Sequence, residues 1–284
     1  MATDPNPLNL DAQIHPLAHA REHVLFDLLA RYLPADSPIT AAQAAREINA
    51  HFPYFQPRYD PTLPHQESGQ DFCFNFWELA FRLPPQLDYR EEPMQRFLAL
   101  RDALSELPPV ILKDGDEFDG RSAWNPPFYF HMMLIERLNQ IGNPEEVGDK
   151  WDIRWRNMNG FLAHLTNSGK RSYLGNALTT IRMGLEENPR KAQPKNITYN
   201  CRAPAAAIWF ILCAPKIYAG CREGISSGRP SMSLWTGESG LNLPRWEFWL
   251  ERLETLKGHS VTTQETKDMC QAAIEAMNRC TVDG

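Results

Sequence analysis

The sequence lacks the cysteine pattern that marks a zinc module. It contains six cysteines, but no two of them form a C-x-x-C pair or a zinc-ribbon spacing. Its 284 residues are enough to bury a sizeable core without a metal or a disulfide. We therefore expect the cysteines to be small buried side chains in a reducing compartment. No metal and no cofactor is expected.

Two other patterns resemble metal sites but fail the requirements of one. His15, His19 and His23 are spaced by four residues, which on a helix places them in a row, but this row lies opposite the apolar face and is unsheltered. The second pattern is acidic and consists of Asp114, Asp116, Glu117 and Asp119. It differs from a calcium loop because its glycine is misplaced and Asn125 takes the place of the closing glutamate. We interpret the first pattern as a solvated face and the second as an acidic turn.

An excess of positive charge is also missing. The chain has 29 Lys and Arg against 35 Asp and Glu, which gives a formal net charge of -6. A nucleic-acid partner or an anionic membrane would need a broad basic face. Neither a P-loop nor a strand-preceded G-x-G-x-x-G occurs, so a nucleotide would find no phosphate cradle. We expect no nucleic-acid partner and no nucleotide cofactor.

Long hydrophobic runs and a secretory signal are absent as well. The N-terminal stretch MATDPNPLNLDAQ has neither a basic region nor an apolar region of the kind that signal peptides contain. The longest apolar run, residues 203–214, is too short to span a bilayer. We therefore expect a cytoplasmic protein that does not contact a membrane, with residues 1–13 as a flexible N-terminal segment.

Convincing strand signals are missing too, whereas helical periodicity recurs along the chain. Thr40 with Gln43, and Thr262 with Glu265, form capping-box patterns at the start of two helical segments. The sequence predicts an all-α fold, a single compact bundle of about ten helices. The predicted helices cover residues 16–33, a segment after residue 40, and residues 68–83, 92–107, 126–141, 145–167, 171–187, 203–221, 244–257 and 263–280.

Three proline-rich or irregular connectors interrupt these helices, at residues 53–65, 108–127 and 188–203. The first and the last are the places where a domain boundary would fall. Aromatic residues lie within both of them, however, and this favours packing against the body over a free linker. We therefore predict one domain over residues 1–284.

Two of the predicted helices are apolar on nearly all sides and are expected to be central. Residues 72–82 have only one narrow polar side, and residues 203–214 are apolar all round. Pro215 follows the second helix and is expected to kink or end it, because proline cannot donate a backbone hydrogen bond. A break inside a buried helix is a place for a cavity, and a plain helix end in the core is the simpler alternative.

The aromatic-rich segment LWTGESGLNLPRWEFWLERL is interpreted as the start of a helix. Its Gly-Glu-Ser-Gly turn has neither the spacing nor the context of a nucleophile elbow. Asn242 suits the cap position, and Trp246 and Trp249 fall on one core-facing stripe. Arg245 is placed to stack on Trp249, and Phe248 points away from the stripe, toward solvent or a partner.

The C-terminal half carries several aromatic motifs in a fixed order. They are an apolar helix, AAAIWFILCAPKIYAG, a Leu-Trp-x-Gly loop, the motif R-W-x-F-W-x-x-R-L starting at Arg245, and the helix TKDMCQAAIEAM. In these features the chain resembles a fungal protein family that is catalogued only as a domain of unknown function. The resemblance covers the last third to half of the chain and involves core residues, so it assigns no catalytic role. It implies a helical fungal protein, of a kind sometimes encoded beside secondary-metabolite genes.

One polar side chain falls inside an apolar stripe. On the predicted helix 126–141, His131 lies between Phe128, Leu134 and Ile135, so we expect it to be buried and hydrogen-bonded. A buried histidine is either a satisfied core residue or an acid-base group. The sequence places no nucleophile or oxyanion donor beside it, and both interpretations stay open.

Two functional hypotheses from different classes follow from these observations. The first is a cofactor-free enzyme or binding protein that acts on an apolar small molecule, with a cyclisation or isomerisation step in fungal secondary metabolism as its reaction. In this hypothesis His131 moves a proton, and the cavity is lined by Phe76, Trp77, Trp209 and Trp246. The second is a helical protein-protein interaction module without catalytic activity, in which exposed aromatic side chains meet another chain.

Overall fold

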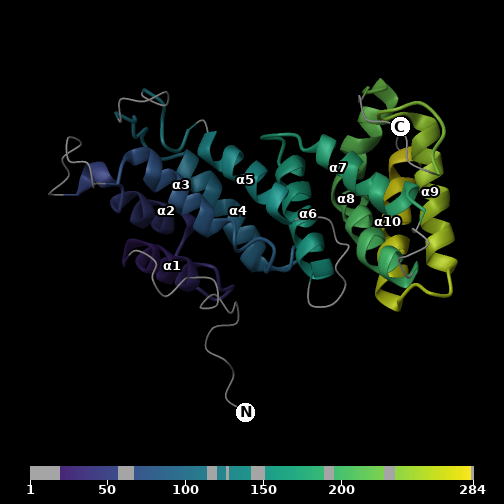
Figure 1. Ribbon diagram of the computed structural model, residues 1–284, viewed down its shortest axis with the longest axis horizontal. Helices are drawn as coiled ribbons and strands as arrows, with labels where there is room; N and C mark the ends of the chain where they lie inside the picture. Colours follow the sequence, from purple (N-terminus) through teal and green to yellow (C-terminus); the bar gives the residue numbers. More distant parts are fainter. Residues whose placement is uncertain are drawn as a thin grey trace, which may run out of the picture. The chain divides into compact units, whose positions relative to one another are not determined.

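The structure is all-helical, as the sequence predicts. A computed structural model describes residues 20–56, 67–113, 120–125, 128–141, 151–188, 195–226 and 234–282. These residues form ten α-helices (Figure 1). The β-structure among them is an isolated bridge between Ile111 and Ser122. Residues 1–13, His15, His19 and the acidic run at 114–119 lie outside the described residues.

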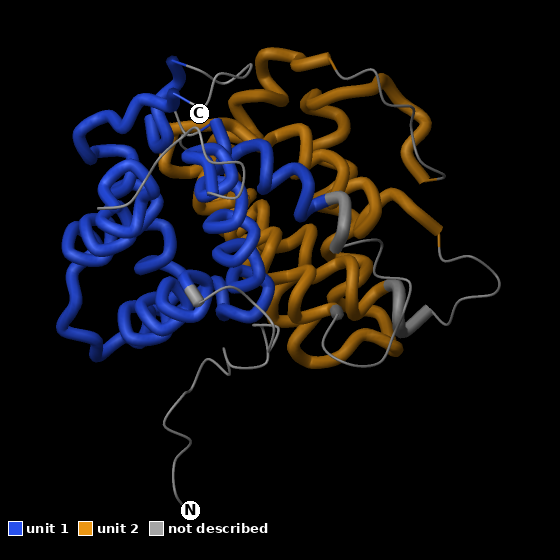
Figure 2. The backbone as a smooth tube through the Cα atoms, turned by 60° about the vertical axis from the view of Figure 1, so that its left-hand side comes forward, with its two compact units in different colours: residues 1–142 blue, residues 143–284 orange. Residues whose placement is uncertain are grey.

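The chain divides into two compact units, residues 1–142 and residues 143–284 (Figure 2). We call them unit 1 and unit 2. The boundary falls between two predicted helices and at none of the three predicted connectors. One domain over the whole chain stays a prediction, because two compact units can belong to one domain.

The described residues of unit 1 form five α-helices. Two of them begin with a complete capping box, at Thr40 with Gln43, as predicted, and at Ser68 with Asp71. The helices of unit 1 are α1 Ala20–Tyr32, α2 Ala41–Ala50, α3 Gly69–Ala80, α4 Glu92–Ser105 and α5 Phe128–Ile141, and a short 3-10 turn covers Pro53–Phe55.

The core of unit 1 is an aromatic cluster around α3, which confirms that this helix is central. The rings of Phe76 and Trp77 lie 4.8 Å apart. Trp124 packs edge-on against Phe76 at 5.7 Å, and Phe130 of α5 packs against Trp77 at 4.9 Å. The indole Nε1 of Trp124 donates a hydrogen bond of 2.8 Å to Asn49 of α2, so the polar edge of this ring is satisfied.

Unit 2 is built around one long helix, α8, which covers Lys195–Glu223. Helix α8 packs against every other helix of unit 2 that the structure describes. Its middle section is buried on all sides, from Ala203 to Phe210, as the apolar sequence predicts. The other elements are α6 Trp151–Asn167, α7 Leu174–Ile181, a π-helical turn η3 Arg182–Glu186, α9 Leu243–Gly258 and α10 Gln264–Val282.

Helix α8 is longer than predicted and does not end at Pro215. It starts eight residues before the predicted run and contains both Pro204 and Pro215. An internal proline costs about 3 kcal/mol. Beyond Pro215, however, Ile217 and Cys221 are buried, and a fully buried aliphatic side chain contributes about 1.5–3 kcal/mol. Burial on the far side of the proline therefore offsets the lost backbone hydrogen bond.

Over Tyr199–Glu223, α8 is long and apolar enough to cross a membrane when judged by length and composition alone. The apolar run at residues 203–214, which is too short to span a bilayer, covers only part of this segment. Of its most apolar window, 67% is buried inside the protein, and the core helix of a soluble protein meets the same two criteria. This is weak evidence for a membrane span, and the absence of membrane contact stays a prediction.

The ends of α9 and α10 test two predicted caps. The side chain of Asn242 accepts a hydrogen bond of 2.9 Å from the backbone N–H of Arg245, which confirms the predicted cap of α9. The capping box predicted for α10, Thr262 with Glu265, is wrong, because the cap lies one residue later. Thr263 caps α10 by accepting from the N–H of Thr266, whereas the Thr262 hydroxyl donates to the end of α9. Neighbouring threonines offer the same chemistry, and tertiary contacts choose between them.

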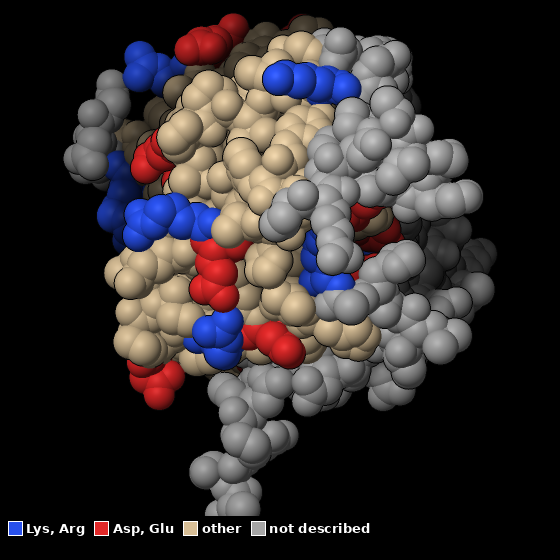
Figure 3. All heavy atoms as spheres, turned by 90° about the vertical axis from the view of Figure 1, so that its left-hand side faces the viewer, with Lys and Arg blue, Asp and Glu red and all other residues tan. Residues whose placement is uncertain are grey.

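Charges of both signs share the surface. On the face shown in Figure 3, Lys and Arg side chains alternate with Asp and Glu side chains among the described residues. The acidic excess of the composition does not gather into one patch on this face.

Gly184 marks the closest approach between the π-helical turn and α8. A Cβ atom at this position would lie 2.7 Å from the carbonyl oxygen of Arg202 and 2.8 Å from the Cβ of Ala206. Because a backbone carbonyl cannot move aside, we predict that Gly184→Ala lowers the free energy of unfolding by about 1–3 kcal/mol. Urea denaturation followed by circular dichroism measures this loss.

Gly175 provides the matched control on α7. A Cβ atom there meets no other atom within 4 Å. Gly175→Ala should leave the free energy of unfolding unchanged or raise it by up to about 1 kcal/mol. Equal effects of the two substitutions would contradict the close packing of η3 on α8.

Candidate ligand-binding groove

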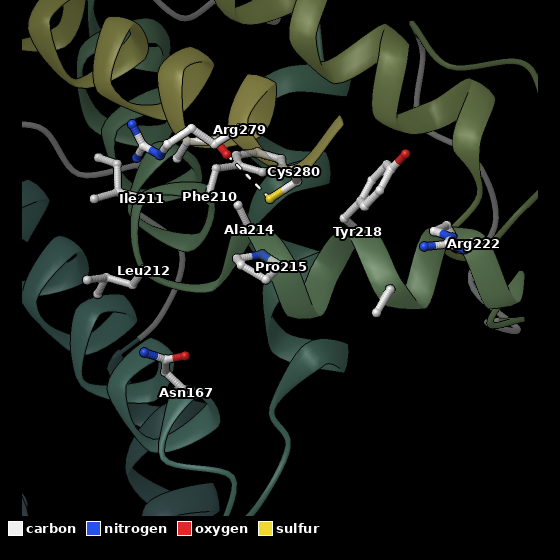
Figure 4. A pocket seen from close by; sticks show the side chains of 12 residues that line it. Asn167, Phe210, Ile211, Leu212, Ala214, Pro215, Tyr218, Arg222, Arg279 and Cys280 are labelled. Atoms are coloured by element: carbon white, nitrogen blue, oxygen red, sulfur yellow. Dashed lines mark hydrogen bonds between the residues drawn. The ribbon is translucent and has the colours of Figure 1, made fainter. Parts of the chain in front are cut away.

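Unit 2 contains an open groove between α8, α10 and the end of α6 (Figure 4). Its volume is about 640 Å³, which lies within the range of small-molecule sites. The floor comes from α8 and is mostly apolar. The apolar and aromatic lining residues of α8 are Phe210, Ile211, Leu212, Ala214, Pro215 and Tyr218, followed by Ala219.

The floor follows one face of α8. Ile211, Pro215, Tyr218 and Arg222 are spaced at i, i+4, i+7 and i+11, which places them on the same side of a helix. From first to last they span about 16 Å of helix axis. Pro215 has no N–H, so the carbonyl of Ile211 lacks its usual donor within the helix. Of the two alternatives that the sequence left open at Pro215, the helix end is not observed, and Pro215 lines the groove.

The opposite wall comes from α10. Ala276, Arg279 and Cys280 share one face of this helix, and Asn167 at the end of α6 completes the lining. The thiol of Cys280 lies 3.4 Å from the carbonyl oxygen of Ala276, to which it donates (Figure 4). The lining residues that the structure describes are apolar, aromatic, basic and amide side chains together with one thiol. This composition suits the binding of a small molecule.

Cys280 differs from the other five cysteines in its exposure. It is half-buried, whereas the other five are buried. Burial raises the pKa of Cys213, Cys221 and Cys270 to about 12, so these side chains remain thiols at neutral pH. The prediction of small buried cysteines is confirmed for five positions, and Cys280 is placed where a groove ligand would touch it.

The five residues predicted from the sequence as site residues are divided between the two units. Phe76, Trp77 and His131 belong to unit 1, and Trp209 and Trp246 belong to unit 2. Each of the four aromatic side chains is buried in the core of its own unit. None of the five lines the groove. A substrate contact for these residues stays a prediction.

Trp209 and Trp246 differ in how their indole nitrogens are satisfied. The Nε1 of Trp209 donates a hydrogen bond of 2.8 Å to Asn159, within the core. Trp246 packs 5.0 Å from the ring of Tyr218 and 5.7 Å from that of Phe210, so it lies one layer behind the groove. Its Nε1 is buried and has no hydrogen-bond partner among the described residues.

His131 is half-buried, whereas the sequence predicted a buried side chain. Its neighbour on the predicted stripe, Ile135, is 52% exposed. The buried face of α5 is shifted by one residue and contains Phe130 and Leu134. Phe130 takes the inner position because its ring packs between Trp77 and Phe81, at 4.9 and 5.0 Å. A shift of one residue turns a helix by about 100°, which explains the error.

Sequence reasoning missed a buried ion pair at the end of the π-helical turn. The Glu186 carboxylate is fully buried, and Arg245 donates to both of its oxygens at 2.7 Å. The Nε1 of Trp249 donates to the same carboxylate, also at 2.7 Å. Arg245 also donates to the carbonyl of Gly240 at 2.6 Å, and its guanidinium carbon lies 5.6 Å from the Trp249 ring. The predicted stacking of Arg245 is thus observed, in the core and with a carboxylate partner.

A comparison with known protein families places the chain in one of them. Residues 77–253, more than half of the chain, match the family model described as protein of unknown function, DUF3632. The chain belongs to the DUF3632 family. The match starts at Trp77 on α3 and ends at Leu253 on α9, so the DUF3632 region reaches further toward the N-terminus than the predicted resemblance did. No curated protein and no solved structure matches the chain.

The DUF3632 region contains the floor of the groove and the buried ion pair. Glu186, Arg245 and all lining residues of α8 fall within residues 77–253. Helix α10 lies beyond the match, and with it Arg279 and Cys280. The groove therefore combines a floor from the DUF3632 region with a wall from outside it.

The ion pair predicts a large effect of neutralising Glu186. In Glu186→Gln the guanidinium of Arg245 remains buried without a counter-charge, which costs about 3–5 kcal/mol. We expect the free energy of unfolding, measured by urea denaturation, to fall by about that amount. The control Glu251→Gln, on the exposed side of α9, should change it by less than about 0.5 kcal/mol.

If Glu186→Gln does not fold, the double variant Glu186→Gln/Arg245→Met decides the matter. Removing both charges should restore part of the stability that is lost when one charge is removed. The recovery is partial because the buried Arg182, 4.0 Å from the Glu186 carboxylate, keeps its charge. An unfolding midpoint of Glu186→Gln equal to that of Glu251→Gln would show that the pair is not needed.

Proposed function

We propose that this protein binds an apolar small molecule in the groove of unit 2. The observation that carries the proposal is the open hollow of about 640 Å³ with an apolar floor on α8. Small-molecule sites of this size are lined mainly by apolar and aromatic side chains, with a few polar groups that orient the ligand. Here Tyr218, Arg222, Arg279 and Asn167 supply those polar groups.

Binding of an apolar ligand in the groove should be favourable, because the ligand displaces water from the apolar surface of the floor. Each Å² of apolar surface removed from water contributes about 25 cal/mol. The floor is also supported from behind, where Phe210 is held by Trp246 and Trp249 at 5.7 and 5.8 Å. Because these contacts already order the floor before a ligand binds, less conformational entropy is lost on binding.

Filling the groove with a side chain tests the proposal. Ala219 lines the groove and is itself exposed, so Ala219→Trp adds bulk without overpacking the core. We expect Ala219→Trp to weaken binding of the neutral apolar dye Nile red at least tenfold in a fluorescence titration. We also expect Nile red to protect Cys280 from Ellman's reagent in the unaltered protein, since both occupy the groove.

Ala42→Trp is the matched control, because Ala42 is equally exposed and lies on α2 of unit 1. It should bind Nile red as the unaltered protein does. Equal dye affinity in Ala219→Trp and Ala42→Trp would overturn the assignment of the groove. Native mass spectrometry on protein purified from a fungal host would then show whether any small molecule co-purifies.

A finer form of the proposal extends binding to chemistry inside a fungal cell. In this form the protein is cytoplasmic and promotes a cyclisation or isomerisation in secondary metabolism, without a cofactor. Its support is the resemblance to a fungal family of a kind sometimes encoded beside secondary-metabolite genes. The proton transfer is assigned to His131, which belongs to unit 1 and does not line the groove, so this form requires a separate substrate site beside His131.

Replacing His131 tests this finer form. A co-purified compound should be converted to a new species by the unaltered protein, and His131→Gln should slow that conversion at least a hundredfold by removing the acid-base group. Liquid chromatography with mass detection measures both rates. Equal rates, or a compound that remains unchanged with the unaltered protein, would leave binding as the function.

The alternative is a protein-protein interaction module. Phe248, the aromatic side chain expected to meet a partner, packs on Trp235 at 5.3 Å and is half-buried. More exposed large apolar side chains occur in both units, with Phe55 at 53% and Ile135 at 52% in unit 1 and Ile153 at 48% in unit 2. A heteromeric species in native mass spectrometry, together with no small-molecule adduct, would favour this alternative.

A further inference from the structure

We propose that the ligand of the groove is an amphipathic carboxylate, with an apolar body on the floor and a negatively charged head at one end. This inference rests on the proposed function and names the chemical class of the ligand. It is carried by two arginines of the lining, Arg222 on α8 and Arg279 on α10.

Both arginines are exposed and available. Within the part of the chain that the structure describes, neither guanidinium forms an ion pair or a hydrogen bond. Among the lining residues that the structure describes there is no acidic side chain. Of the described acids next to them in sequence, Glu275 lies one turn before Arg279 without forming an ion pair with it, and Glu223 follows Arg222 and is thus turned about 100° away on the helix.

The helix ends offset only part of the charge of the two arginines. Arg222 lies in the last turn of α8 and Arg279 in the last turn of α10. The end of a helix contributes about half a negative charge, which is less than the full positive charge of a guanidinium. Each guanidinium can therefore still attract an anionic head.

The two arginines lie at opposite ends of the groove. Figure 4 shows Arg279 beside Ile211 and Arg222 beyond Tyr218, with Pro215 between them. An elongated ligand can thus place its head at either arginine and lay its body along the same floor. A planar guanidinium can hold a carboxylate by two parallel hydrogen bonds, so one arginine is enough for one carboxylate head.

Three probes of equal chain length test the head group by displacement of Nile red: decanoate, 1-decanol and decylamine. At low ionic strength we expect decanoate to bind at least fivefold more tightly than 1-decanol, and decylamine to bind most weakly because its ammonium group is repelled. Raising the salt concentration to 0.5 M should reduce the advantage of decanoate, since exposed charges are screened.

Arginine variants locate the head. The double variant Arg222→Ala/Arg279→Ala should weaken decanoate binding about three- to tenfold, as expected for an exposed charge-assisted pair, and leave Nile red affinity within twofold. The single variants show which end holds the carboxylate. Arg46→Ala, an exposed arginine of α2 in unit 1, removes the same charge and should change neither affinity.

The outcomes separate this inference from the proposed function. If Nile red binds and Ala219→Trp blocks it, but 1-decanol binds as tightly as decanoate, then the groove is a binding site and the anionic ligand is refuted. Equal decanoate affinity in the double variant and in Arg46→Ala refutes it as well. If Nile red binds Ala219→Trp as tightly as the unaltered protein, the proposed function fails first.

Discussion

The buried carboxylate of Glu186 is the constraint on which unit 2 depends. A charge in a protein interior is tolerated only when its oxygens are fully bonded, and here Arg245 and Trp249 supply the donors. The backbone carbonyl of Glu186 accepts from Leu234 as well, at 2.9 Å. The π-helical turn, the loop before α9 and α9 itself are thereby held in one register, because sliding any of them would leave an unpaired charge in the core.

Local patterns were sufficient to predict most of the helices. The capping box at Thr40 and the cap at Asn242 depend on neighbours in sequence, and both are confirmed. The errors arise where distant contacts decide. The cap of α10 lies at Thr263 because Thr262 instead bonds to the end of α9, and α5 is turned because Phe130 fits between two rings of the unit 1 core. Neither contact is visible in the residues beside it.

The site was less predictable than the fold. A glutamate in a helical segment looks the same in sequence whether it is solvated or buried, so Glu186 gave no signal. Arg245 directly precedes the core residue Trp246 and lies one turn before Trp249, and this was the available clue, because its charge must be met by a distant acid. The groove depends on α10 lying beside α8, and no local pattern brings Arg279 to the same hollow as Arg222. From the sequence, Pro215 was a place where a hollow could form, with a helix end as the alternative.

Pro215 has a mechanical consequence for the groove. A helix that lacks one rung of its hydrogen-bond ladder bends more easily at that point than an intact helix, and here the soft point lies in the middle of the floor. For the proposed binding role, slight bending of α8 at this point would change the width of the groove. A site of adjustable width would accept ligands of different thickness and select them by head group more strictly than by shape.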